Sequence, residues 1–188
     1  MKRVGLLLAA GLSRRFGEED KLLAPWRGKP LVSYAAKVLR SLPLDGLAAV
    51  VRSDAVAREL GEIDHIHQPA PERGQGTSLA IGAAYAAEQQ ADRLLILLAD
   101  MPLVSARHAE EVLKTCTDDR PCLSRDGELV APPACFPGSW FAELKALEGD
   151  QGAGSLLRRK ETAPLFVDAL RGELRDVDTV QDLEEAAA

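Results

Sequence analysis

The stretch Val4-Gly5-Leu6-Leu7-Leu8-Ala9-Ala10 has no polar side chain and runs directly into Gly11, Leu12 and Ser13. Since the side chains of a strand alternate between the two faces of a sheet, a strand without polar positions must be covered on both faces. The stretch Arg93-Leu94-Leu95-Ile96-Leu97-Leu98-Ala99 is the clearest second example. Such strands indicate a parallel sheet with helices on each side, and we expect 4–10 to lie centrally in it.

Longer amphipathic segments alternate with these apolar runs along most of the chain. The patterns predict helices over 30–42, from Ser53 or Asp54 to residue 60, over 77–90 and over 105–116, and further strands over 47–51 and 63–67. Beyond Pro121 we expect antiparallel strands around 122–123 and 129–135. The order predicts an α/β protein, with residues 1–188 forming a single three-layer α/β/α domain around a mostly parallel sheet.

The charge of the chain limits its partners. A formal net charge of −6 over 188 residues argues against a general nucleic-acid-binding surface. The distribution is uneven, because residues 1–50 carry nine lysines and arginines against four aspartates and glutamates. Positive charge at one end of an acidic protein suggests a local anion site, although chance clustering on a solvated face would give the same count.

Membrane and export signals are weak. No apolar run approaches the ~20 residues of a membrane span, and the apolar start of the chain ends in Gly11, Arg14 and Arg15 without a convincing cleavage site. Cys116, Cys122 and Cys135 form no CxxC pair and cannot all be joined in disulfides. We therefore expect a cytoplasmic protein with no membrane partner, and cysteines that act as small buried side chains.

The loop after the first strand carries the residue types of an anion site. Small residues at 10, 11 and 13 allow the backbone to approach a ligand, and exposed N–H groups can then cradle phosphate oxygens. Arg14, Arg15 and Lys21 add positive charge nearby. The spacing is neither the P-loop pattern nor GxGxxG. By composition alone, a polar loop on the rim of the sheet is about as well supported as phosphate binding.

A resemblance to a known family favours phosphate binding. The pattern Leu-Ala-Ala-Gly-x-Ser-x-Arg-x-Gly-x-x-x-Lys over residues 8–21 resembles the signature of the nucleotidyltransferases with a Rossmann-like fold. Within them, the chain is most similar to the molybdenum cofactor cytidylyltransferases. Four further blocks resemble that family in its own order, and they cover residues 74–82, 97–102, 149–157 and 176–183.

The resemblance implies roles for individual residues. Arg15 and Lys21 would contact a triphosphate and act in catalysis, while the segment Leu8, Ala9, Ala10, Gly11, Leu12 and Ser13 would bind the nucleotide. Gly76 and Thr77 would contact the base or the ribose, although Thr77 could instead cap a helix. Contacts to the pyrophosphate leaving group would be strongest in the transition state, because its charge develops there.

Two aspartates are candidate ligands for Mg²⁺. Asp100 directly follows the strand over 93–99, and its Asp-Met-Pro context favours a catalytic metal ligand over a turn or cap residue. Asp150 matches the family block Gly-Asp-x-Gly-Ala and is the second candidate, with an N-cap of the following helix as a nearly equal alternative. In the last block, Thr179 and Asp182 are spaced as a capping box, so we read that block mainly as structure.

The resemblance implies that CMP is transferred from CTP to a molybdopterin-type cofactor, with a molybdenum hydroxylase as a possible recipient of the product. Gly154 and Pro132 depart from the family pattern on its acceptor side and leave the acceptor open. Guanylyl or another nucleotidyl transfer is one alternative, against which Ala10 counts because guanylyl relatives carry glycine there. A non-catalytic carrier of the cofactor is the other alternative, although it would have no need of Arg15, Lys21 and Asp100.

Overall fold

A computed structural model describes residues 1–17, 19–149, 151–158 and 162–187. Its largest sheet has seven strands in the order β5-β4-β1-β6-β8-β7-β9. Neighbours are parallel except at β8, which is antiparallel to both β6 and β7. The strands are β1 (Arg3–Ala9), β4 (Gly46–Val51), β5 (Asp64–His67), β6 (Arg93–Leu98), β7 (Cys122–Asp126), β8 (Leu129–Pro137) and β9 (Leu165–Asp168). The predicted mostly parallel α/β fold and the central place of the first strand are confirmed.

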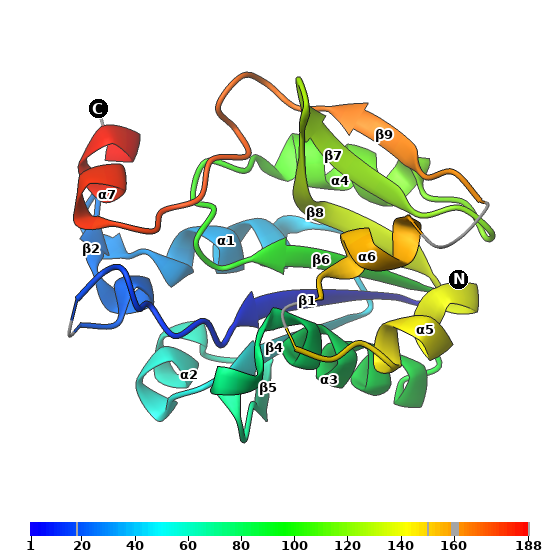
Figure 1. Cartoon of the computed structure of the whole chain (residues 1–188), viewed down its shortest axis with the longest axis horizontal. Coiled ribbons are helices and arrows are strands. Elements are labelled where there is room, and N and C mark those ends of the chain that lie inside the picture. Colours follow the sequence, from blue (N-terminus) through cyan, green and yellow to red (C-terminus); the bar gives the residue numbers. More distant parts are fainter. Residues whose placement is uncertain (18, 150, 159–161, 188) are drawn as a thin grey trace.

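Helices cover both faces of this sheet (Figure 1). One apolar cluster joins alternate residues of β1 to α1, α2 and α4, and a second joins the remaining residues of β1 to α3, α5 and α6. The uninterrupted apolar pattern of β1 thus has the expected cause, since both faces of this strand are buried. The helices are α1 (Val32–Ser41), α2 (Asp54–Leu60), α3 (Gln75–Glu88), α4 (Ala106–Thr115), α5 (Phe141–Lys145), α6 (Ala153–Leu157) and α7 (Val180–Ala187).

The connection between β1 and α1 differs from the sequence prediction. The segment expected to open the helix at Pro30 instead forms a hairpin of β2 (Pro25–Trp26) and β3 (Lys29–Pro30). Its two turn residues, Arg27 and Gly28, have φ values of 46° and 84°. Positive φ at both central positions is typical of a tight hairpin turn, so α1 begins only at Val32.

The C-terminal segment returns to this hairpin. Figure 1 shows α7 beside β2, at the end of the sheet to which the strands β1, β4 and β6 point. Val177 and Ala186 pack in a small apolar cluster with Trp26 and Leu31. Thr179 and Asp182 form the predicted capping box, because the Asp182 backbone N–H donates to Thr179 Oγ1 at 3.1 Å and the Thr179 N–H donates to Asp182 Oδ2 at 2.8 Å. This packing places residues 176–178 near the carboxyl ends of the central strands.

The cysteines and the helices of the described chain bear on two further expectations. All three cysteines are buried free thiols, as predicted. Within the described ranges, none of the helices is long and apolar enough to cross a membrane. Short 3₁₀ helices at Lys21–Leu23, Pro71–Arg73 and Gly138–Trp140 complete the secondary structure.

A buried glutamate ties the C-terminal segment to α4. Glu173 is 7% exposed and accepts hydrogen bonds from the Ser105 N–H (2.9 Å), the Ser105 hydroxyl (2.6 Å) and the Leu170 N–H (3.0 Å). Burial alone would raise the pKa of Glu173, but these hydrogen bonds outweigh it and lower that pKa below its ordinary value.

We expect Glu173→Gln to lower the free energy of unfolding by about 1–3 kcal/mol, because an amide cannot satisfy all three donors as a carboxylate does. Since the carboxylate is favoured in the folded state, the advantage of the wild-type chain should be complete above the ordinary pKa of 4.5 and shrink as the pH falls through the lowered pKa. Urea unfolding of both chains between pH 3 and pH 7 measures this difference. Glu184→Gln, at an exposed position of α7, is the control, and an equal, pH-independent loss in both variants would contradict the prediction.

Candidate active site

A cavity of about 360 Å³ opens at the carboxyl ends of β1 and β6. It is the place where ligands bind in open parallel sheets. Its wall comes from four segments far apart in the sequence: the loop after β1, the start of α3, the segment that follows β6 and the segment that precedes α7. The lining residues are Leu8, Ala10–Arg15, Lys21, Pro71, Glu72, Gly74, Gln75, Ser78, Leu98, Asp100 and Asp178.

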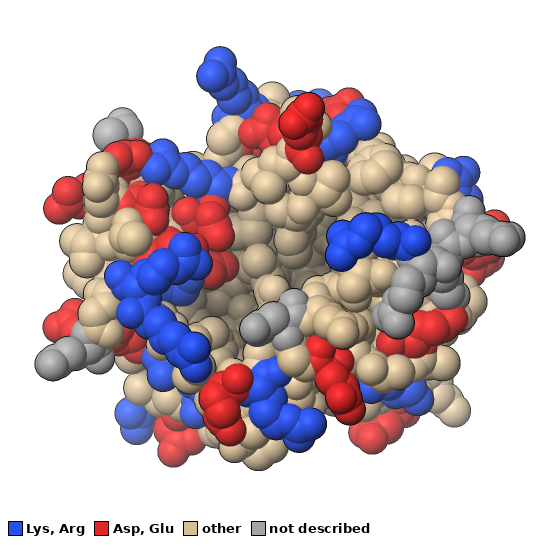
Figure 2. Space-filling view, in the orientation of Figure 1, with Lys and Arg blue, Asp and Glu red and all other residues tan. Residues whose placement is uncertain are grey.

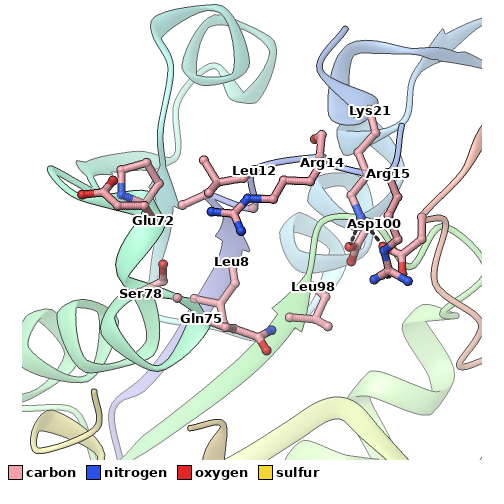
Figure 3. Close-up of a pocket in the computed structure, with 16 residues that line it drawn as sticks. Leu8, Leu12, Arg14, Arg15, Lys21, Glu72, Gln75, Ser78, Leu98 and Asp100 are labelled. Carbon is pink, nitrogen blue, oxygen red and sulfur yellow. Dashed lines mark hydrogen bonds and ion pairs between the residues drawn. The ribbon is translucent and has the colours of Figure 1, made fainter. Parts of the chain in front are cut away.

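One end of this cavity is charged. Lys21 is 6% exposed, and its Nζ lies 2.7 Å from Asp100 Oδ2 and 2.9 Å from Asp178 Oδ1. The Nη2 of Arg15 lies 2.6 Å from the other oxygen of Asp178, although the Arg15 side chain is 73% exposed. Figure 3 shows Lys21, Arg15 and Asp100 together at this end, while Arg14 extends into the space between them and the opposite wall.

The protonation of Lys21 follows from its neighbours. Burial of the ammonium group favours its neutral form, but the carboxylates of Asp100 and Asp178 outweigh this effect and raise the pKa of Lys21 above its ordinary value. Lys21 is therefore a permanent cation at neutral pH. Nearby, burial and the charges of Asp178 and Asp100 raise the pKa of Asp176. The charged end of the cavity thus brings two cations, Lys21 and Arg15, close to a larger number of acidic groups.

The loop that carries Lys21 is anchored by Asp20. Its Oδ1 caps the short helix at Lys21–Leu23 by accepting the Leu22 N–H at 3.1 Å, and it also accepts a hydrogen bond from Ser13 at 3.4 Å. Its other oxygen lies 2.7 Å from Arg52, which follows β4. These contacts hold both ends of the loop against the sheet. The backbone that carries Lys21 is consequently fixed in position by these contacts.

The opposite end of the cavity is formed by the start of α3. Gly74, Gln75 and Ser78 line it, together with Pro71 and Glu72 of the preceding turn. Ser78 is 6% exposed, and its hydroxyl accepts a hydrogen bond from the buried Gln68 amide at 3.2 Å. In Figure 3, Ser78 and Glu72 lie across the cavity from Lys21 and Asp100. The hydroxyl proton of Ser78 is consequently available to a group in the cavity.

Gly76 and Thr77, which the sequence assigned to the base or ribose, face elsewhere. Gly76 packs against the turn before α6: its N–H donates to the Gly149 carbonyl at 2.8 Å, and a Cβ at Gly76 would lie 2.6 Å from the Gln151 carbonyl oxygen. The Thr77 hydroxyl donates to the Arg73 carbonyl at 3.1 Å. The helical repeat of 3.6 residues puts Gln75 and Ser78 on the cavity side and turns Thr77 away from it.

The other predicted residues are distributed as follows. Leu8, Ala10, Gly11, Leu12, Ser13, Arg15, Lys21 and Asp100 all line the cavity. Ala9 is buried with α1 on the other face of the sheet, because its side chain alternates with those of Leu8 and Ala10. Asp150 lies outside the described residues.

Asp178 is the site residue that sequence reasoning missed. It lies 157 positions from Lys21 in the chain, and the capping pattern beside it led to a structural reading of its block. It reaches the site because the Val177 N–H donates to the carbonyl of Asp100 at 2.9 Å while the Val177 side chain is fully buried. A signal was present in the sequence, because residues 176–183 form one of the blocks that resemble the family.

A second cavity of about 220 Å³ adjoins the first and shares Leu8, Gln75 and Leu98 with it. Its other lining residues are Leu79, Ile96, Leu123, Val130, Ala131, Pro132, Ala134, Phe136, Gly152, Ala153 and Gly154. No charged side chain is among these described lining residues. Figure 2 shows the hollow of this face, with Lys, Arg, Asp and Glu crowded at its left edge and a largely uncharged floor. The two residues that depart from the family pattern, Pro132 and Gly154, both line this second cavity.

The strand order, with a lysine, an arginine and two carboxylates gathered at the ends of the central strands, is the arrangement expected of a Rossmann-like nucleotidyltransferase. Residues 5–164 match the family "MobA-like NTP transferase domain". The chain belongs to this family of nucleotidyltransferases.

Individual relatives agree with this assignment. The chain is 32% identical to "Purine catabolism protein PucB" of Bacillus subtilis (strain 168), over 96% of this chain and 94% of the relative. It is 31% identical to "Molybdenum cofactor guanylyltransferase" of Ectopseudomonas mendocina (strain ymp), over 76% of this chain and 69% of the relative. The solved structure "A nucleotidyl transferase from Methanothermobacter thermautotroptrophicus (Mth528)" superposes with a TM-score of 0.88 at 18% identity, covers 99% of this chain and 96% of its own, and shares the fold.

Proposed function

We propose that this nucleotidyltransferase transfers CMP from CTP to a phosphorylated acceptor, the molybdopterin-type molybdenum cofactor, and releases pyrophosphate. The observation that carries the proposal is the placement of Lys21 and Arg15 beside Asp100 and Asp178 at one end of a cavity that continues into a second, apolar cavity. A nucleotide and an acceptor can occupy the two cavities side by side.

The two ends of the first cavity suit the two ends of a nucleoside triphosphate. Lys21 and Arg15 offer positive charge to the phosphates, and the backbone of residues 11–13 lies beside them. Ser78 and Gln75 at the opposite end offer a hydroxyl and an amide to a base or ribose. Arg14, which extends between the two ends, can neutralise further phosphate charge.

The donor set suits Mg²⁺. Among the described residues no group of three metal-ligating side chains comes together, but Asp100 and Asp178 present their carboxylates to the same region of the cavity, beside the Lys21 ammonium group that both contact. Two carboxylates with phosphate oxygens and water satisfy this hard cation. Mg²⁺ bound there would offset phosphate charge on the triphosphate. Asp150, also predicted as a ligand, remains a proposal.

The reaction requires one bond to form and one to break. A phosphate oxygen of the acceptor forms the bond to the α-phosphorus of CTP, and the bond between that phosphorus and the β-bridging oxygen breaks. The electron pair of the broken bond leaves with pyrophosphate. Lys21 and Arg15 stabilise the charge that develops on this leaving group, and Asp100 and Asp178 keep the two cations oriented.

The second cavity is the place that we propose for the body of the acceptor. Gly154 leaves its wall open, and the Nη1 of Arg158 lies 3.8 Å from the position that a Cβ of Gly154 would take. The Arg158 guanidinium group therefore lies close to the Gly154 position, although Arg158 is not among the described residues that line the second cavity. We further propose that the dinucleotide product passes to a molybdenum hydroxylase.

We expect CTP to be used in preference to GTP. Ala10 is 5% exposed, lines the first cavity and belongs to the apolar cluster on the α3 face, so its methyl group forms part of the cavity wall on that side. A methyl group at this wall should crowd a purine more than a pyrimidine. Pyrophosphate release with the molybdenum cofactor and each of the four nucleotides measures the preference.

The matched variant is Ala10→Gly, which should raise kcat/KM for GTP relative to CTP by about tenfold, the effect of one or two methylene-sized contacts. Ala24→Gly, at a buried alanine outside the cavity, is the control. Turnover with GTP equal to or better than with CTP in the wild-type chain would contradict the preference. It would favour guanylyl transfer, the second candidate, which the similarity to molybdenum cofactor guanylyltransferases supports.

A further inference from the structure

The wall of the second cavity contains an irregularity in the sheet. Leu123 of β7 pairs with Ala134 of β8, but the next residue, Ser124, pairs with Ala131. Two residues of β8, Pro132 and Pro133, therefore have no partner on β7 and form a bulge. Since proline has no backbone N–H, this part of the ladder cannot close by a shift in register. Pro132 of the bulge and Ala131, which precedes it, line the cavity.

Two buried side chains, those of Ser124 and His108, stabilise this bulge through hydrogen bonds. The Ser124 hydroxyl donates to the Pro133 carbonyl at 2.7 Å, and His108 Nε2 lies 2.7 Å from the same hydroxyl oxygen. Because the single hydroxyl proton is used toward Pro133, His108 must donate from Nε2. Ser124 is fully buried and His108 is 5% exposed. The orphaned carbonyl of the bulge is thus satisfied through a chain of two hydrogen bonds.

The chain of hydrogen bonds acts from the opposite face of the sheet. Leu123 belongs to the apolar cluster on the α3 face, and Ser124, the next residue of β7, faces α4 and reaches His108. His108 lies in the first turn of α4, where its N–H donates to Ser105 Oγ at 3.1 Å. Ser105 in turn donates to Glu173. These hydrogen bonds consequently fix the position of His108, although His108 lines neither cavity.

We propose that His108 and Ser124 are positioning residues for the acceptor, because they hold Ala131 and Pro132 at the wall of the second cavity. This inference rests on the proposed function, in which the acceptor occupies that cavity. The first cavity has its own supports, Asp20 and Arg52, on the other side of β1. Loss of the hydrogen-bond chain should therefore weaken acceptor binding and leave nucleotide binding largely unchanged.

The test compares Ser124→Ala, His108→Leu and His108→Gln in the full chain. We expect the first two to raise KM for the molybdenum cofactor by about tenfold and to change KM for CTP by less than about twofold, since they leave the buried Pro133 carbonyl or its support unpaired. His108→Gln retains an N–H donor and should restore most of the acceptor affinity. Arg93→Leu, which removes the ion pair between the buried Arg93 and the exposed Asp118 at the opposite end of β6, controls for general loss of stability.

Equal changes in both KM values, or the same shift in Arg93→Leu, would overturn the positioning role. If the wild-type chain does not transfer CMP to the molybdenum cofactor, the proposed acceptor is wrong. The positioning role of His108 and Ser124 is then tested by hydrogen exchange, which needs no acceptor. Ser124→Ala should then speed exchange at the amides of 129–131 and 134–136 while the Kd for CTP with Mg²⁺ stays within about twofold of wild type. Faster exchange throughout the chain in proportion to lost stability would overturn the inference in that case as well.

Discussion

Lys21→Met should lower kcat and kcat/KM by about 10²-fold or more. The methionine retains the length of the side chain but removes the only described cation that contacts both Asp100 and Asp178. A charge that acts on a developing pyrophosphate should affect kcat as well as kcat/KM. Steady-state rates of pyrophosphate release measure the effect, and Lys29→Met, at an exposed lysine of the nearby hairpin, is the matched control. Turnover of Lys21→Met comparable to that of the control would remove Lys21 from the mechanism.

The same substitution should also destabilise the protein. At an exposed position on the rim of the sheet, a substitution usually changes the free energy of unfolding by about 0.5 kcal/mol or less. Lys21, in contrast, is buried between two carboxylates. Its removal leaves the Asp100 carboxylate without its cation and leaves Asp178 paired with Arg15 alone, and we expect a loss of about 1–3 kcal/mol in the free energy of unfolding. Mg²⁺ should restore more stability to the variant than to wild type, because the Asp100 carboxylate then lacks the cation that it pairs with in the wild-type chain. Urea unfolding with and without Mg²⁺ measures this difference.

The fold was largely predictable because its strongest signals are local. A strand that is apolar on both faces has few places to lie except inside a helix-covered sheet, and β1 and β6 both meet that condition. The exceptions are equally physical. The hairpin over residues 25–30 turns on Arg27 and Gly28, a pair that lacks the Asn-Gly or Asp-Gly signal of such turns. β9 pairs only with β7, over four residues, and its short sequence gave no distinct period.

The candidate site was predictable where its residues follow strands and unpredictable where tertiary packing brings them in. Lys21 and Asp100 lie directly after a short loop and a strand that the pattern identified. Asp178 reaches the same point only because Val177 and α7 pack on the N-terminal hairpin. Gly76 was assigned to the ligand because a glycine permits close approach of another group. In the structure, the groups that approach Gly76 closely are the carbonyls of Gly149 and Gln151. Composition cannot tell these two uses apart.

Asp100→Asn should lower kcat by about 10²-fold or more and raise the Mg²⁺ concentration needed for half-maximal activity. The substitution keeps the volume of the side chain but removes a charge that Lys21 and a bound Mg²⁺ would share. Asp178→Asn should act in the same direction, since its carboxylate faces the same ammonium group. The loss in the double variant should be less than the product of the two single losses, because both carboxylates would serve one cation.

The competing explanation for Asp100 is a structural turn residue, and the two explanations separate when activity is expressed per folded molecule. A structural residue predicts a lower melting temperature with near-normal turnover and unchanged Mg²⁺ dependence in the folded fraction. A metal ligand predicts low turnover in protein that remains folded. Asp118→Asn, an exposed aspartate that pairs with Arg93 at the opposite end of the sheet, controls for loss of an ion pair alone. Wild-type turnover of Asp100→Asn across a Mg²⁺ titration would exclude Asp100 from the site and leave Asp178 without a partner in binding the metal.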